Sequence, residues 1–179
     1  MENWDDIMEL NIIIKTNLSK SEKQGIYNIL NMCDNDFIPP LSSRDSFKDK
    51  SFNTNSKSTT IYKYYKSLID SNTIYAIAYD KTDNTIIALS VLEEGVDNSL
   101  YLSTICVLLN YRNQGICRKL LETIINYAYT NKYTKIHTRT WSTNIIQKAI
   151  LEKMGFQYVH TEKELRTKEV YSLYYDLCL

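Results

Sequence analysis

Histidine and closely spaced cysteines are scarce in this chain of 179 residues, which contains two histidines and four cysteines. The cysteines are Cys33, Cys106, Cys117 and Cys178, and no two of them form a CxxC motif. Structural zinc sites in proteins are built from clustered sulfur and imidazole ligands. We therefore expect no metal in this protein.

The chain also lacks an excess of charge of either sign, because 21 lysines and arginines balance 21 aspartates and glutamates. This balance predicts no attraction to nucleic acid or to an anionic membrane. No apolar run approaches the ~20 residues of a membrane-spanning helix. The first residues, MENWDDIMEL, are acidic and lack the pattern of a signal peptide. We expect a protein of the reducing cytoplasm.

Residues that interrupt regular structure are few, with two prolines and four glycines. Apolar residues make up 44% of the chain and charged residues 23%, which is typical of a globular protein. There is no internal repeat and no linker-like segment. The length and composition predict one domain that spans residues 1–179.

Hydrophobic periodicity predicts an α/β (α+β) fold with about seven strands and about four helices. A capping-box pattern at 19–22 starts the first helix, and Pro39 and Pro40 end the segment that follows it. Residues 42–60 fit either a short helix or a loop. Strands are expected at 11–17, 73–80, 85–93, 100–108, 134–141, 156–161 and 170–178, and helices at about 19–33, 59–69, 116–128 and 143–154.

The most informative stretch runs from 103 to 128 and reads as a buried strand, a tight loop and a helix. Arg112, Arg118 and Lys119 lie around the predicted helix start, and the first acidic residue of the helix is Glu122. A helix start carries unpaired N–H groups and a partial positive charge, and therefore favours an anion. With Gly115 in the loop, the pattern is that of a diphosphate-binding site. Solvated surface cations beside a simple turn are the alternative.

The loop Arg112-Asn113-Gln114-Gly115-Ile116-Cys117 resembles the acetyl-CoA-binding loop of the GNAT superfamily of N-acetyltransferases. Cys117 stands where the family usually has a third small residue, and Leu109 stands where it usually has proline. A second match begins at Asn144 and ends at Gly155-Phe156, and it is similar to the second cofactor-binding helix of that family. Together the two motifs cover residues 100–157.

The resemblance implies a mixed, mostly antiparallel GNAT-like sheet flanked by helices. It implies an enzyme that moves an acetyl group from acetyl-CoA to a primary amine of a small molecule or a peptide. A GNAT-fold module that binds acyl-CoA without turnover is the alternative. The expected cofactor-binding residues are Val107, Leu108, Leu109, Arg112, Asn113, Gln114, Gly115, Ile116, Cys117, Arg118, Lys119 and Asn144. Asn144 also fits a helix N-cap.

The residues that carry out proton transfer are less defined. Relatives place a tyrosine seven residues after the asparagine, where this chain has Leu151. Tyr111 and Ser142 are other donors close in sequence. Glu93 and Glu94 are candidates for the general base, or are solvated turn residues. Asp34 and Asp36 either attract a cationic amine or cap the preceding helix. No motif identifies the acceptor or the oligomeric state.

Overall fold

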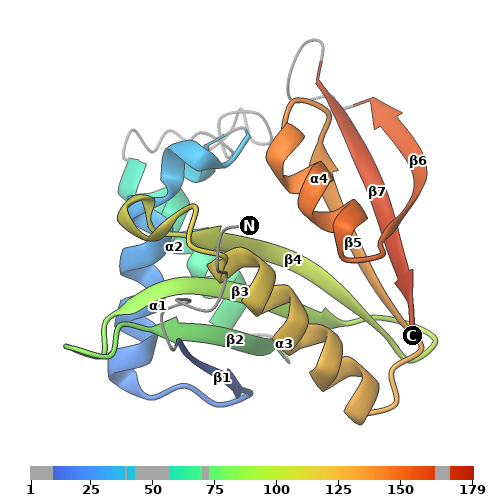
Figure 1. Cartoon of the computed structure of the whole chain (residues 1–179). Helices are drawn as coiled ribbons and strands as arrows, with labels where there is room; N and C mark the ends of the chain where they lie inside the picture. The colour runs from blue at the N-terminus through green and yellow to red at the C-terminus, as the bar shows by residue number, and fades with distance from the viewer. Residues whose placement is uncertain (1–9, 39, 43–56, 70–72, 164–169) are drawn as a thin grey trace, which may run out of the picture.

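The computed structural model describes residues 10–38, 40–42, 57–69, 73–163 and 170–179 (Figure 1). This part of the chain contains seven strands and four α-helices. The strands are β1 Asn11–Lys15, β2 Thr73–Tyr79, β3 Ile86–Glu94, β4 Ser99–Val107, β5 Lys135–Trp141, β6 Gln157–Lys163 and β7 Tyr171–Cys178. The helices are α1 Lys20–Met32, α2 Lys57–Ile69, α3 Ile116–Thr130 and α4 Ile145–Lys153, with 3-10 turns η1 Asp34–Asp36 and η3 Leu109–Tyr111.

The strands form one sheet in the order β1-β2-β3-β4-β5-β7-β6. All neighbours are antiparallel except β4 and β5, which are joined by the α3 crossover and run parallel. The pairing of β4 with β5 is short, because only Ser99–Leu102 and Lys135–Thr138 are in register. Beyond these residues the two strands diverge, as Figure 1 shows beside α4. Among the described strands, the second half of β4 therefore has no neighbour on the side of β5, and we call this side the free edge.

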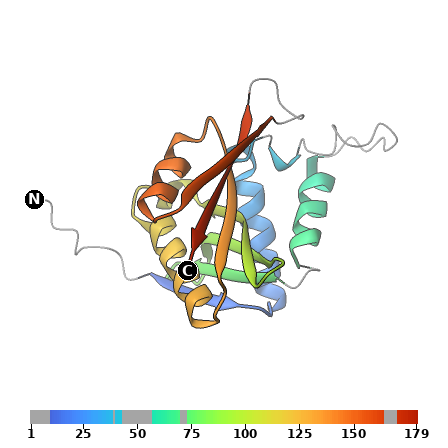
Figure 2. The same cartoon turned by 90° about the vertical axis from the view of Figure 1, so that its right-hand side faces the viewer.

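Helices cover both faces of the sheet, with α3 and α4 on one side and α1 and α2 on the other (Figure 2). The α3 side buries Leu120, Leu121, Ile124 and Ala128 at a spacing of three or four residues. The α1 side buries Ile26, Ile29 and Leu30 against β2 and β3. The apolar residues of each helix recur every three or four positions because only one face of the helix packs against the sheet.

The fold class predicted from the sequence is confirmed, and the predicted elements agree closely with the observed ones. The first strand ends at Lys15 and not at residue 17, because a bend at Thr16 and Asn17 leads into the cap of α1. The α2 helix begins at Lys57. Most of the undecided segment 42–60 lies outside the described residues. No described helix is long and apolar enough to span a membrane.

The start of α1 is held by a partly buried carboxylate. The side chain of Glu22 accepts hydrogen bonds from the Ser19 N–H (2.8 Å) and the Tyr79 hydroxyl (2.7 Å), and it forms an ion pair with Lys15. Burial alone would raise the pKa of Glu22, but these partners together lower it to about 2 from an ordinary value of 4.5. The charged carboxylate of Glu22 thus links α1 to β1 and β2.

Glu22→Gln is expected to lower the free energy of unfolding by about 1–3 kcal/mol at pH 7, since only the charged form gains from these partners. Because the folded-state pKa is depressed, this stabilisation is complete above about pH 4.5 and is lost as the pH falls toward 2. Urea unfolding at pH 7 and at pH 3 measures the difference. The control Glu122→Gln removes an exposed partner of Arg118 and should cost under about 1 kcal/mol at both values. A pH-independent loss in Glu22→Gln would contradict the assignment.

Candidate functional site

The free edge of β4 begins at a β-bulge. Val91 of β3 pairs with Thr104 and Leu92 pairs with Leu102, so Ser103 is the extra residue on β4. A bulge increases the local twist and redirects a strand. The bulge therefore coincides with the place where β4 and β5 separate, and among the described strands β3 is the only sheet neighbour of β4 beyond it.

Backbone groups near the end of β4 point alternately toward β3 and toward the free edge. The Leu108 N–H donates to the Ile87 carbonyl of β3 (2.9 Å), so it is used within the sheet. The Val107 carbonyl points the other way and accepts from Nε of Arg112 (2.9 Å). By the alternation of strand residues, the Val107 N–H lies on the free edge. Of the three positions predicted to hold the pantetheine arm, Val107 is oriented for it and the Leu108 N–H is not.

The start of α3 lies just after this edge and has the features of an anion site. Gly115 is its N-cap, with φ 74° in the left-handed region that favours glycine. No acidic residue lies in the first turn, and no side chain of the described residues caps it. A Cβ built on Gly115 would meet no atom within 4 Å, so the approach is open. The N–H groups of the first turn, from Ile116 to Arg118, are thus available to a phosphate.

The three cations predicted around this helix start take different positions. The guanidinium of Arg112 turns away from α3 and pairs with Asp36 of η1, with Nη1 3.0 Å from Oδ1. Arg112 therefore joins η1 to the end of β4, which is a structural role. Arg118 is largely exposed on the first turn of α3, and its Nε lies 2.8 Å from Glu122 one turn later. Arg118 and Lys119 remain close to the helix start.

Other loop residues shape the turn. Asn113 has a positive φ of 61°, a conformation that asparagine tolerates better than most residues. Gln114 donates from its side chain to the Asn110 carbonyl (3.2 Å). Burial raises the pKa of the Cys117 thiol to about 11, so this group is neutral at physiological pH and acts as a small packing residue. This agrees with the small residue expected at that position.

The second predicted motif forms the start of α4. Asn144 is its N-cap, and Oδ1 accepts from the Gln147 N–H (3.1 Å), as the capping interpretation predicted. Leu151 is fully buried in the core on the α3 side together with Phe156. Position 151, where relatives have tyrosine, is thus part of the hydrophobic core and holds no proton donor.

The structure separates the two glutamates proposed as general bases. Adjacent strand residues face opposite sides of a sheet. Glu94 accepts from the Tyr133 hydroxyl (2.7 Å), next to the end of α3. Glu93 lies opposite Tyr101 of β4, whose hydroxyl it influences electrostatically. Glu93 therefore pairs with a residue that lies two positions before the bulged Ser103. Glu94 points to the other face of the sheet.

Several other polar candidates have structural partners. Both carboxylate oxygens of Asp34 bind Ser42, one through the N–H (2.8 Å) and one through the hydroxyl (2.6 Å). The Tyr111 hydroxyl donates to Asp80 (2.6 Å), and this bond raises the pKa of Tyr111. The Ser142 hydroxyl accepts from the Tyr171 N–H (3.1 Å). In the described part of the chain, no group of three or more metal-ligating side chains is arranged to hold a metal ion.

A group of side chains that the sequence did not single out lies on the α2 side of the bulge. Tyr101 of β4 is in electrostatic contact with Tyr64 of α2, Arg139 of β5 and Tyr174 of β7. Burial raises the pKa of Tyr101, and Arg139 opposes that rise. The Tyr174 hydroxyl donates to Glu162 (2.8 Å). We call Tyr64, Tyr101, Arg139 and Tyr174 the tyrosine–arginine group. It lies on the face of the sheet opposite α3.

Comparison with known proteins defines the family. The sequence model of the acetyltransferase (GNAT) domain family matches residues 42–176, which is most of the chain. No curated protein sequence matches significantly. The chain belongs to the GNAT acetyltransferase family, as the two sequence motifs predicted, and is an acetyl-CoA-dependent N-acetyltransferase.

Solved structures of low sequence identity share the fold. The ribosomal-protein-S18-alanine N-acetyltransferase of Escherichia coli is 16% identical, with a TM-score of 0.67 over 94% of each chain. The NatC complex, solved with Gag peptide and CoA, contains a chain that is 21% identical, with a TM-score of 0.65 over 94% of this chain and 98% of that one. A protein of Bacillus anthracis described as a streptothricin acetyltransferase, solved with acetyl coenzyme A, is 24% identical over 60% of this chain and 62% of its own, with a TM-score of 0.55.

Proposed function

We propose that the protein transfers the acetyl group of acetyl-CoA to a primary amine of a small molecule or a peptide, and that residues 1–179 form one domain for this purpose. One observation carries the proposal: the open, acid-free start of α3 at Gly115 adjoins the free edge of β4. The first offers N–H groups and Arg118 to the diphosphate of CoA. The second offers the N–H of Val107 to the pantetheine arm.

The geometry also divides the roles of the two faces. The cofactor enters between the starts of α3 and α4, and Asn144 lies at that entrance. The pantetheine arm of the cofactor follows the free edge of β4 toward the bulge at Ser103. The thioester at its end then reaches the tyrosine–arginine group, on the sheet face opposite α3. The acceptor amine approaches from that face. A lysine-like amine has a pKa near ~10.4 and must lose a proton before it attacks. Glu93 accepts that proton, directly or through water.

The acceptor class is tested by release of free CoA over a panel of amines. The structural neighbours named above act, by their names, on a protein alanine and on streptothricin, which supports including both kinds of acceptor. The panel therefore contains peptides with a free N-terminus, streptothricin, polyamines, amino sugars and amino acids. Turnover with one class and acetylation of its amine nitrogen, shown by mass spectrometry, is expected. Tight acetyl-CoA binding without turnover on the whole panel would favour the binding module instead.

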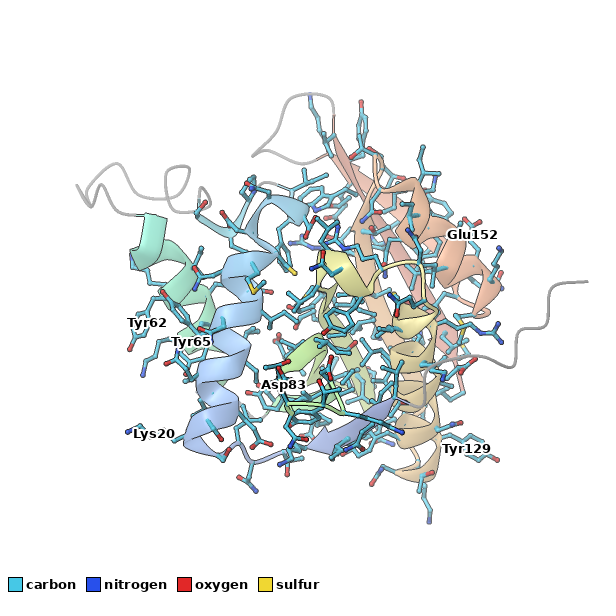
Figure 3. All side chains as sticks on the ribbon, turned by 60° about the vertical axis from the view of Figure 1, so that its left-hand side comes forward. Lys20, Tyr62, Tyr65, Asp83, Tyr129 and Glu152 are labelled. Atoms are coloured by element: carbon cyan, nitrogen blue, oxygen red, sulfur yellow. The ribbon has the colours of Figure 1, made fainter. Side chains whose placement is uncertain are left out.

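Arg118→Glu is expected to weaken the binding of CoA by about tenfold, since charge-assisted bonds to phosphate exceed neutral ones. A pantetheine fragment without the nucleotide should lose little affinity, because Arg118 lies at the diphosphate end. Calorimetry of both ligands measures the two losses. Lys20→Glu, at the start of α1, makes the same change of charge far from the loop and should leave both affinities unchanged (Figure 3). Equal losses for both ligands in Arg118→Glu would contradict the role of Arg118.

A further inference from the structure

The hydroxyl of Tyr64 reaches from α2 to the sheet at the bulge of β4. It lies 2.5 Å from the hydroxyl oxygen of Thr104. The half-buried ring of Tyr64 also makes a T-shaped contact with Phe37, with centroids 6.4 Å apart. The side chain is therefore held by a hydrogen bond at one end and by an aromatic contact along its body.

Thr104 marks the place where acetyl transfer would occur in the proposed function. It follows the bulged Ser103 directly, and β4 loses β5 as a neighbour two residues earlier, at Leu102. The Thr104 side chain is buried and faces α2. From Val107 to Thr104 the free edge measures about 10 Å, a distance over which the extended arm can follow it. The phenol of Tyr64 thus stands beside the reacting end of the cofactor.

Breaking the carbon–sulfur bond of the thioester leaves a thiolate, which is better stabilised if a group donates a proton to it. Leu151 is apolar and buried, and the Tyr111 hydroxyl is committed to Asp80 at the other end of the loop. Tyr174 lies on β7, which is two strands away from β4 in the sheet order. Tyr101 lies on the paired part of β4, before the bulge. Among the described tyrosines on the α2 face of the sheet, Tyr64 is the one whose hydroxyl is hydrogen-bonded beside the bulge, at Thr104.

We propose that Tyr64 is the proton donor to the departing thiolate of CoA, with Thr104 as the hydrogen-bond partner that orients it. The inference rests on the proposed function, because it takes the thioester to lie at the free edge of β4. Either hydroxyl can be the donor in the bond between them; in this role Thr104 donates to the phenol oxygen, which leaves the Tyr64 O–H directed toward the sulfur. As the amine nitrogen bonds to the acetyl carbon and the carbon–sulfur bond breaks, the Tyr64 proton passes to sulfur. The nitrogen loses its first proton to Glu93 before it attacks. Its second proton, lost as the amide forms, returns through water to the phenolate, which restores Tyr64.

The test uses bound CoA and needs no acceptor. A hydrogen bond from Tyr64 to sulfur stabilises the thiolate and lowers the pKa of the bound thiol below that of the thiol in free CoA. The ultraviolet absorbance of the thiolate, taken as the difference between protein with CoA and protein with desulfo-CoA, is measured against pH. This difference removes the absorbance of the protein's own cysteines and tyrosines. Calorimetry gives the affinity for CoA in parallel.

In Tyr64→Phe we expect the pKa of the bound thiol to rise by about one unit, with the affinity for CoA changed by less than about threefold. The phenyl ring keeps the contact with Phe37, so the variant should fold. Tyr62→Phe is the matched control: this tyrosine is on the same helix but packs on Tyr27 of α1, away from α3 (Figure 3). It should leave the thiol pKa unchanged. Thr104→Val, which removes only the orienting hydroxyl, should give a smaller rise than Tyr64→Phe.

The outcomes separate the two claims. An unchanged thiol pKa in Tyr64→Phe, with CoA still bound, overturns the assignment of Tyr64 and leaves the proposed function intact. Absence of CoA binding by the wild-type protein overturns the proposed function and this inference with it. With an acceptor from the panel, Tyr64→Phe should also lower kcat by roughly 10²-fold or more, while KM for acetyl-CoA stays constant. Equal kcat values for Tyr64→Phe and Tyr62→Phe would contradict the assignment.

Discussion

Gly115→Asp should reduce the affinity for acetyl-CoA by a hundredfold or more. A carboxylate at this position would lie beside the diphosphate at the start of α3. Two like charges about 4 Å apart repel by about 4 kcal/mol at the effective dielectric constant of a protein surface. The added side chain also fills the open approach, where nothing lies within 4 Å of a Cβ. Isothermal calorimetry with acetyl-CoA measures the loss.

Folding and binding can be separated at this position. Aspartate and asparagine tolerate the left-handed conformation better than most residues, and both are good partners for a helix start. Gly115→Asn is therefore the matched control, because it has the size of aspartate without the charge. It should fold as well and keep considerably more affinity than Gly115→Asp. Equal affinities of the two variants, or wild-type affinity in Gly115→Asp, would show that no anion binds here.

Leu151→Tyr should destabilise the protein by about 1–3 kcal/mol, because it inserts a larger, polar side chain into a packed core. Leu151 is fully buried and belongs to the core shared by α3, α4 and the sheet. Turnover should not rise, since a phenol at this position is enclosed and Tyr64 already serves the bulge. Chemical denaturation and CoA release measure both effects.

Leu151→Met is the control for this substitution, because it nearly conserves the volume and should cost less than about 1.5 kcal/mol. A Leu151→Tyr protein as stable as wild type, with a large gain in turnover at constant acetyl-CoA affinity, would contradict the account. It would show that position 151 faces the thioester and that the natural site lacks a donor.

The elements that sequence patterns predicted well are those set by local rules. The face of α3 follows from the spacing of Leu120, Leu121, Ile124 and Ala128, and the same residues are buried in the structure. The anion site at Gly115 follows from an acid-free helix start, which is a local feature. These properties depend on residues within a few positions of one another, and therefore the sequence shows them.

The parts that sequence patterns did not predict depend on contacts between distant residues. Arg112 was expected at the cofactor, but Asp36, 76 residues earlier, holds its guanidinium. Tyr64 meets Thr104 across 40 residues, and nothing in the spacing of α2 distinguishes it from Tyr62 or Tyr65. Glu93 and Glu94 are adjacent on one strand and so face opposite sides of the sheet, but only the tertiary pairing places Glu93 opposite Tyr101 and Glu94 beside Tyr133. Such pairings arise from tertiary packing and have no local signal.

The central claim is that acetyl-CoA lies along the free edge of β4 and ends at the start of α3. Titration of nitrogen-15-labelled protein with acetyl-CoA, followed by amide NMR, tests it most directly. We expect the largest shift changes at Val107 and at Ile116, Cys117 and Arg118, with little change at Leu108, whose N–H is bonded to Ile87. Saturable shift changes confined to other parts of the molecule, with these amides unaffected, would contradict the account.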